Sequence, residues 1–183
     1  PMLLPQAMNS RLAPQSVSRP LPGLPFIRTT LSVDTPTTLV HVSSRMLPVW
    51  GISPEQALDL AAANVRALAA SDPLQPMQVE GVGTIWASRE AGDHPLAGLE
   101  ASRVVDLAQI SSQVGAQPGQ PVAIIVPRRD SLVAMVSPSP RELWLLQTFA
   151  EHEFSEAKHP LLHYPILVTD GEVRVAVVQQ QEQ

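Results

Sequence analysis

Residues 122–143, "VAIIVPRRDSLVAMVSPSPREL", contain the local pattern that decides the fold. Two apolar runs flank the polar 127–130 segment, a composition typical of two buried strands joined by a turn. Ser139 follows, with a proline at the next position and Glu142 three positions on, and this order is the capping box that begins a helix. The stretch therefore predicts a hairpin followed by a helix, whose apolar residues continue to about Lys158.

The same order of elements occurs earlier in the chain. The stretch "IRTTLSVDTPTTLVHVSS" has β-branched residues on both sides of a turn at 34–36. Shortly afterwards "SPEQAL" repeats the capping box from Ser53, and apolar residues then recur at helical spacing. Units of the form ββα at 27–70 and 121–158 hint at an internal pseudo-repeat, although their sequence identity is low.

The remaining segments complete the predicted architecture. Residues 77–88, "MQVEGVGTIWAS", are typical of one strand, which Gly81 or Gly83 can interrupt, and 99–114 has apolar residues at helical spacing with Gly115 placed to end the helix. The stretch "YPILVTDGEVRVAVV" predicts a third hairpin about a turn at 169–171. Three hairpins and about three helices define an α+β fold with a mostly antiparallel sheet.

Residues 1–25 differ from the rest of the chain in composition. They are rich in proline and have no helical or alternating apolar pattern, so we expect an irregular or polyproline-like N-terminal extension. We expect residues 26–178 to form a single α+β domain, followed by a polar tail at 179–183. The chain starts with Pro rather than Met, which is compatible with the earlier removal of a leader.

The composition excludes several classes of protein. No cysteine is present, so disulfides, thiolate zinc sites and cysteine nucleophiles are excluded. The net charge of -5 and the lack of a long basic run argue against a nucleic-acid partner. The longest apolar runs are far shorter than the ~20 residues that span a bilayer. We therefore expect a soluble cytoplasmic protein without a membrane partner.

The stretch "EHEFSEAKHP", at 151–160, concentrates side chains of the kinds that bind metals. His152, Glu156 and His159 fall on one face of the predicted helix. A helix rises ~1.5 Å per residue, which separates the two histidines by ~10 Å along the axis, too far for one ion with bonds to nitrogen of ~2 Å. We interpret the stretch as the polar face of an ordinary helix, and we expect no metal and no cofactor.

Two other polar stretches are candidates for ligand binding. The turn at 127–130 has a guanidinium pair suited to a carboxylate or a phosphate, although arginine and aspartate are also ordinary turn residues. The 92–103 loop places an Asp-His pair near the start of a predicted helix, where a general base is conceivable and a capping role is the simpler interpretation. The candidate binding residues are Asp93, His94, Arg103, Arg128, Arg129, Asp130 and Trp50.

Five short phrases are distinctive. They are Trp50-Gly51 before the first capped helix, Ala63-Asn64 within it, Ala101-Ser102-Arg103, the Pro127-Arg128-Arg129-Asp130 turn, and His159-Pro160-Leu161. Through these phrases residues 30–175 resemble the YtpQ-like family of bacterial proteins, which carry a domain of unknown function. The resemblance implies a bacterial α+β protein with no established catalytic mechanism, and it transfers no catalytic residue. The proline-rich N-terminus lies outside the resemblance.

These observations favour a non-catalytic protein-binding module, because hairpins, capped helices and an acidic surface explain nearly every residue. The proline-rich N-terminal segment is one candidate for docking its protein partner. An alternative is a hydrolase or small-ligand enzyme with a polar cleft built from the 92–103 loop and the 127–130 turn. A third hypothesis is a homodimer formed by strand addition at a hairpin edge. Convergence of the first ββα turn, the 92–103 loop and the 127–130 turn on one concave pocket would favour the enzyme, and their separation would argue against it.

Overall fold

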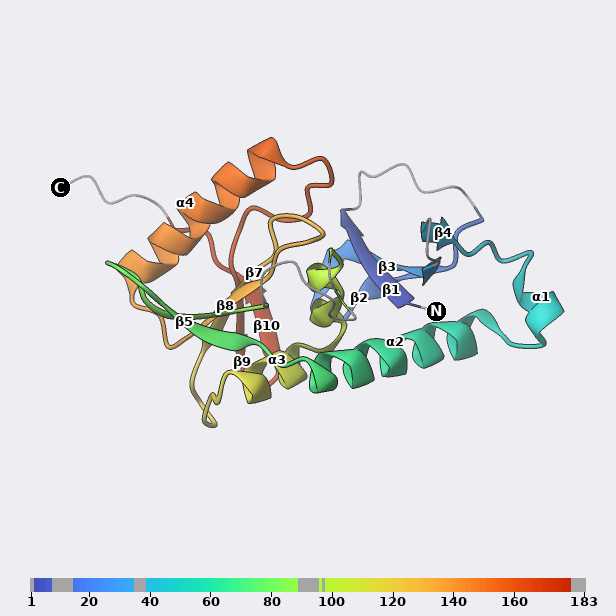
Figure 1. Ribbon diagram of the computed structural model, residues 1–183, viewed down its shortest axis with the longest axis horizontal. Helices are drawn as coiled ribbons and strands as arrows, with labels where there is room; N and C mark the ends of the chain where they lie inside the picture. The colour runs from blue at the N-terminus through green and yellow to red at the C-terminus, as the bar shows by residue number, and fades with distance from the viewer. Residues whose placement is uncertain (1, 8–14, 35–38, 89–95, 97, 179–183) are drawn as a thin grey trace.

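Two antiparallel sheets and their covering helices make up the computed structural model, which describes residues 2–7, 15–34, 39–88, 96 and 98–178 (Figure 1). In the first sheet β3 lies between β1 and β2 and also pairs with β4. Its strands are β1 (Met2–Ala7), β2 (Ser18–Leu21), β3 (Leu24–Asp34) and β4 (Leu39–His41).

The second sheet has the order β10-β9-β7-β8-β6-β5, with every neighbouring pair antiparallel. Its strands are β5 (Gln75–Val79), β6 (Gly83–Ala87), β7 (Val122–Ile125), β8 (Val133–Val136), β9 (Ile166–Thr169) and β10 (Glu172–Val175). The helices are α1 (Leu47–Trp50), α2 (Pro54–Ser71), the 3-10 helix η1 (Glu100–Asp106), α3 (Leu107–Gln113) and α4 (Pro140–Glu156). The α+β prediction with mostly antiparallel pairing is confirmed.

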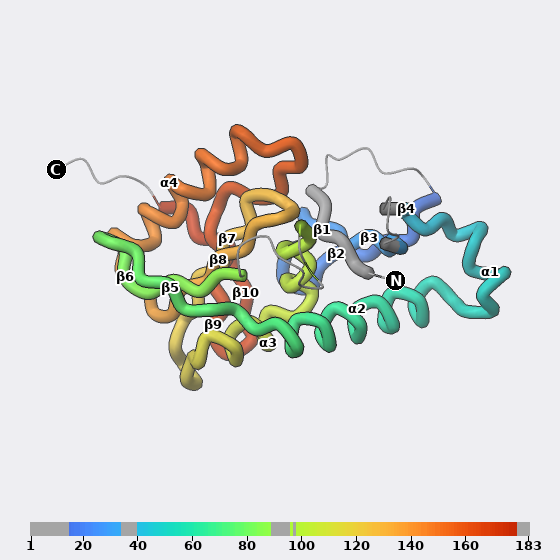
Figure 2. The backbone as a smooth tube through the Cα atoms, in the orientation of Figure 1, coloured from blue at the N-terminus to red at the C-terminus, as the bar shows by residue number. Residues whose placement is uncertain are grey.

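Both faces of the second sheet are covered. Side chains alternate along β7, so that Val122 and Ile124 join one buried cluster while Ala123 and Ile125 join another. α4 packs Leu146 against the second face, while η1, α3 and the β2–β3 corner pack against the first. α2 covers the first sheet and runs from the end of the molecule that carries α1 to its middle, near α3, from where the chain continues into β5 (Figure 2).

Both predicted capping boxes are confirmed, and they fix where the two long helices begin. In α2 the Ser53 hydroxyl accepts from the Gln56 amide at 3.2 Å, and the Gln56 side chain accepts from the Ser53 amide at 2.8 Å. In α4 Ser139 and Glu142 form the same reciprocal pair. These hydrogen bonds favour the charged carboxylate, so they hold the pKa of Glu142 below its ordinary value.

The prediction of irregular chain for residues 1–25 is wrong in two places. β1 and β2 both lie in this segment and pair with β3, and the side chains of Val17, Leu21 and Leu24 are buried. Prolines do not exclude these strands, because a strand at the edge of a sheet has one side on which an N–H is not needed. The segment therefore forms part of the core rather than only a tail.

Three further boundaries differ from the prediction. The single strand at 77–88 is a hairpin, because Gly81 and Gly83 have positive φ angles of 75° and 98° and allow the chain to turn. The single helix at 99–114 is η1 followed by α3, divided at Asp106, whose backbone is not helical and whose side chain caps the second helix by accepting from the Gln109 amide. The α4 helix ends at Glu156 rather than Lys158.

The three predicted hairpins are confirmed by the pairing of their strands, which are β3–β4, β7–β8 and β9–β10. Residues 35–38, between β3 and β4, lie outside the described residues. The two ββα units lie in different sheets, and α1 is inserted between hairpin and capped helix in the first unit only.

Candidate functional site

The 127–130 turn is held from two sides by segments that are distant in the sequence. Its Arg129 carbonyl accepts a hydrogen bond of 3.0 Å from the Ala101 amide at the start of η1. Its Pro127 carbonyl accepts one of 2.9 Å from the Leu161 amide, beyond the end of α4. The structure therefore brings together three of the distinctive phrases, and the end of the 92–103 loop meets this turn.

Arg128 connects the turn to α4. Its guanidinium lies 3.0 Å from the Asp130 carboxylate and 3.1 Å from that of Glu153. The Arg128 side chain is 40% exposed, and a pair of this kind contributes about 0–1 kcal/mol to stability. The positive charge of Arg128 is therefore offset by two carboxylates, those of Asp130 and Glu153.

The second arginine is different. The Arg129 guanidinium makes no hydrogen bond or ion pair with any described residue, whereas the Nε atoms of both arginines are shielded from solvent without a hydrogen-bond partner there. The neighbouring His159 is exposed, yet its pKa lies below its ordinary value, first because the protein atoms around the ring displace some of its water and then because Arg129 and Lys158 repel its proton. Asp130 opposes this shift more weakly.

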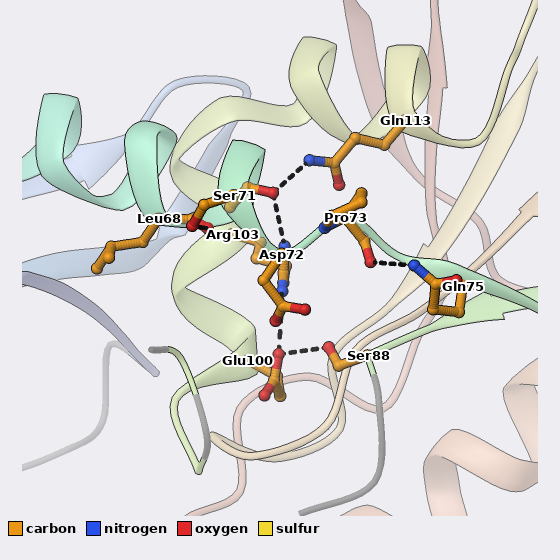
Figure 3. A network of polar contacts seen from close by, with 10 residues as sticks. Leu68, Ser71, Asp72, Pro73, Gln75, Ser88, Glu100, Arg103 and Gln113 are labelled. Carbon is orange, nitrogen blue, oxygen red and sulfur yellow. Dashed lines mark hydrogen bonds and ion pairs between the residues drawn. The ribbon is translucent and has the colours of Figure 1, made fainter. Parts of the chain in front are cut away.

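Arg103 lies in the core, at the centre of a charged network (Figure 3). Its side chain is 1% exposed and lies 3.1 Å from the Asp72 carboxylate and 3.3 Å from that of Glu100. Ser88 donates a short hydrogen bond to Glu100, and Arg103 also donates to the Ala69 carbonyl at 3.4 Å. The network joins the C-terminal end of α2 to η1 and to the residue after β6.

Of the three remaining candidate binding residues, only Trp50 is described, and it lies apart from Arg103 and the 127–130 turn (Figure 1). Asp93 and His94 lie outside the described residues. Trp50 is 41% exposed at the end of α1, which is at the opposite end of the molecule from the β5–β6 hairpin (Figure 1).

An apolar pocket, which we call the α4–hairpin pocket, lies between α4, β8 and the β5–β6 hairpin. Its volume is about 190 Å³, and its lining residues are Val79, Val82, Ile85, Val133, Leu145, Leu146 and Phe149. Phe149 is 44% exposed, although the helical spacing predicts it to lie in the core. The sequence interpretation missed the pocket because it treated 77–88 as one strand, which leaves no hairpin to form the second wall.

A serine–histidine pair also escaped the sequence interpretation. Ser32 Oγ lies 2.9 Å from His41 Nδ1 across the β3–β4 pair. Such a pair resembles a nucleophile and its base. Ser32 is 0% exposed, however, so its hydroxyl cannot reach a substrate in this conformation, and the contact joins the two strands.

Two other hollows are more polar. One, of about 350 Å³, lies where Ser16 and Arg19 face the start of α2, and the other, of about 410 Å³, lies between the end of α3 and the β9–β10 turn. The described residues contain no group of three or more histidine, aspartate or glutamate side chains close enough together to hold a metal ion. Nor does that part of the chain contain a helix with the length and apolar character needed to cross a membrane.

Comparison with protein-family models, curated proteins and solved structures finds no match to this chain. The resemblance to the YtpQ-like family therefore stays a prediction.

Proposed function

We propose that this chain is a non-catalytic, cytoplasmic protein-binding module whose partner places one apolar side chain in the α4–hairpin pocket. The observation that carries the proposal is the pocket itself, which is lined only by hydrophobic residues and opens beside an exposed aromatic ring. Solvent-exposed apolar surface of this kind commonly marks an interaction site.

The size of the pocket favours a side chain over a small-molecule substrate. Its volume of about 190 Å³ is below the roughly 300–1,000 Å³ typical of small-molecule sites. A single large apolar side chain matches it better, and buried anchors in small pockets commonly dominate protein–protein affinity. The lining includes no acid, base or nucleophile that could catalyse a reaction.

The surrounding surface extends this apolar area. Met77 is 46% exposed and pairs across the hairpin with Ile85, so both side chains lie on the face that carries the pocket. The hairpin edge is less suited to strand addition, because Pro76 in β5 has no N–H to donate. This argues against a homodimer formed at β5, and light scattering at micromolar concentration should show a monomer.

The proline-rich N-terminal segment is a weaker candidate for docking. Removing residues 1–25 would delete two strands and the buried side chains of Val17, Leu21 and Leu24, so a truncated chain would test folding rather than binding. The enzyme alternative has partial support, since Ala101 contacts Arg129, but its proposed general base lies outside the described residues.

The proposal is tested by affinity purification from the native host after mild cross-linking, followed by mass spectrometry. Phe149→Asp should abolish recovery of the partner, because a charge at the rim of an apolar pocket must be desolvated on binding. Leu60→Asp is the matched control, since Leu60 is 53% exposed on α2 and carries the same change. Loss of the partner in both variants, or in neither, would contradict the proposal.

A further inference from the structure

We propose that the 127–130 turn and the segment after α4 form a binding site for an oxyanion, a carboxylate or phosphate group, held by Arg129, Lys158 and His159. This site is separate from the α4–hairpin pocket and does not depend on the proposed function.

The charges around the 127–130 turn favour an anion. Arg128 already faces the carboxylates of Asp130 and Glu153. Arg128 and Pro160 form an antiparallel bridge, which places Arg129 and His159 at adjacent positions of the two segments, with Lys158 directly before His159. Arg129 and Lys158 make no ion pair with any described residue, so in a chain with a net charge of -5 they leave a local positive field that attracts anions.

The backbone of Arg129 is fixed, and its guanidinium is available to donate hydrogen bonds. Arg129 belongs to a turn whose backbone is fixed by hydrogen bonds from Ala101 and Leu161, so its main chain loses little freedom when a ligand binds. The Arg129 guanidinium makes no hydrogen bond with any described residue, so its terminal N–H groups keep unused hydrogen-bonding capacity, whereas its Nε, like that of Arg128, is shielded from solvent. A planar guanidinium donates two parallel hydrogen bonds to a carboxylate or phosphate.

The imidazole of His159 gives the site a pH dependence. Arg129 and Lys158 disfavour the charged ring, while Asp130 favours it, and Arg128 and Glu153 beside them are paired with each other. A bound oxyanion would offset the two cations and raise the pKa of His159. By linkage, the oxyanion should therefore bind more tightly as the pH falls.

The test is an NMR titration of the full chain with inorganic phosphate and, separately, acetate, against sodium chloride at matched ionic strength. We expect saturable shifts of the Arg129 Nε–H and the His159 ring. Arg129→Gln should weaken binding by about tenfold or more, because charged hydrogen bonds are lost. Arg141→Gln, which removes an exposed cation from the first turn of α4, should leave it unchanged.

The arms of the titration distinguish the source of the oxyanion. Saturation with phosphate alone would assign a phosphate group, and saturation with both salts would assign the shared chemistry. Shifts that equal those in sodium chloride, or that persist in Arg129→Gln, would overturn the proposal. If Arg129→Gln fails to fold, the pair Lys158→Ala and His159→Gln in one chain should show the same loss of binding, and unchanged binding there would equally overturn it.

Discussion

Replacing Arg103 by methionine tests the buried network most severely. Methionine retains most of the side-chain volume but leaves the Asp72 and Glu100 carboxylates without their guanidinium, while their side chains are only 11% and 6% exposed. Removing one partner of a buried ion pair typically costs about 3–5 kcal/mol. We expect about 3 kcal/mol, at the lower end, because Ser88 still donates to Glu100. That loss is a large share of the roughly 5–15 kcal/mol that stabilises a typical domain.

Urea unfolding at pH 7, followed by tryptophan fluorescence, measures this free energy. The control Arg141→Met removes an exposed arginine and should change stability by less than about 0.5 kcal/mol. Adding Glu100→Gln to Arg103→Met should recover part of the loss, because one of the two buried carboxylates that lose the guanidinium is then replaced by a neutral amide. A loss below about 1 kcal/mol for Arg103→Met would refute the structural role of the network.

Two further predictions concern His159 and Gly23. Because the folded pKa of His159 lies below its ordinary value of 6.5, its stabilising contribution is present above that value and is lost as the pH falls through the folded pKa. His159→Gln should therefore lose less stability between pH 7.5 and pH 5 than the unchanged chain in urea unfolding, whereas an equal loss would contradict the assigned environment. Gly23→Ala should destabilise by about 1–3 kcal/mol more than Gly119→Ala. Both glycines have positive φ, but a Cβ at Gly23 would lie 2.7 Å from Val173 Cβ while Gly119 faces open space, so equal thermal shifts would exclude the clash.

The elements that sequence predicts well depend on neighbouring residues. Ser53 and Ser139 each begin a helix through contacts three positions away, and the β7–β8 hairpin follows from two apolar runs and a polar turn. Prediction from the sequence fails where the structure of a segment depends on residues that are distant in the chain. β1 and β2 exist because β3 pairs with them, and Arg103 is buried because Asp72, far earlier in the chain, supplies a carboxylate.

For the candidate sites too, local sequence indicates residue types, whereas long-range packing determines which residues lie together. Residue types identify the 92–103 loop and the 127–130 turn as polar candidates, but only the structure shows that the two segments meet, through the Ala101–Arg129 hydrogen bond. The α4–hairpin pocket could not be anticipated, because it requires the packing of α4 against a hairpin whose turn depends on the positive φ of Gly81 and Gly83.

Site-specific photo-cross-linking in the native host tests whether a protein partner docks at the α4–hairpin pocket. A photoreactive amino acid would replace Met77, beside the α4–hairpin pocket, or Leu60 on α2 as the control; the two side chains are 46% and 53% exposed. We expect one discrete protein adduct from position 77 that Phe149→Asp abolishes, and no such adduct from position 60. The same adduct from both positions, or none from position 77, would contradict the proposed docking.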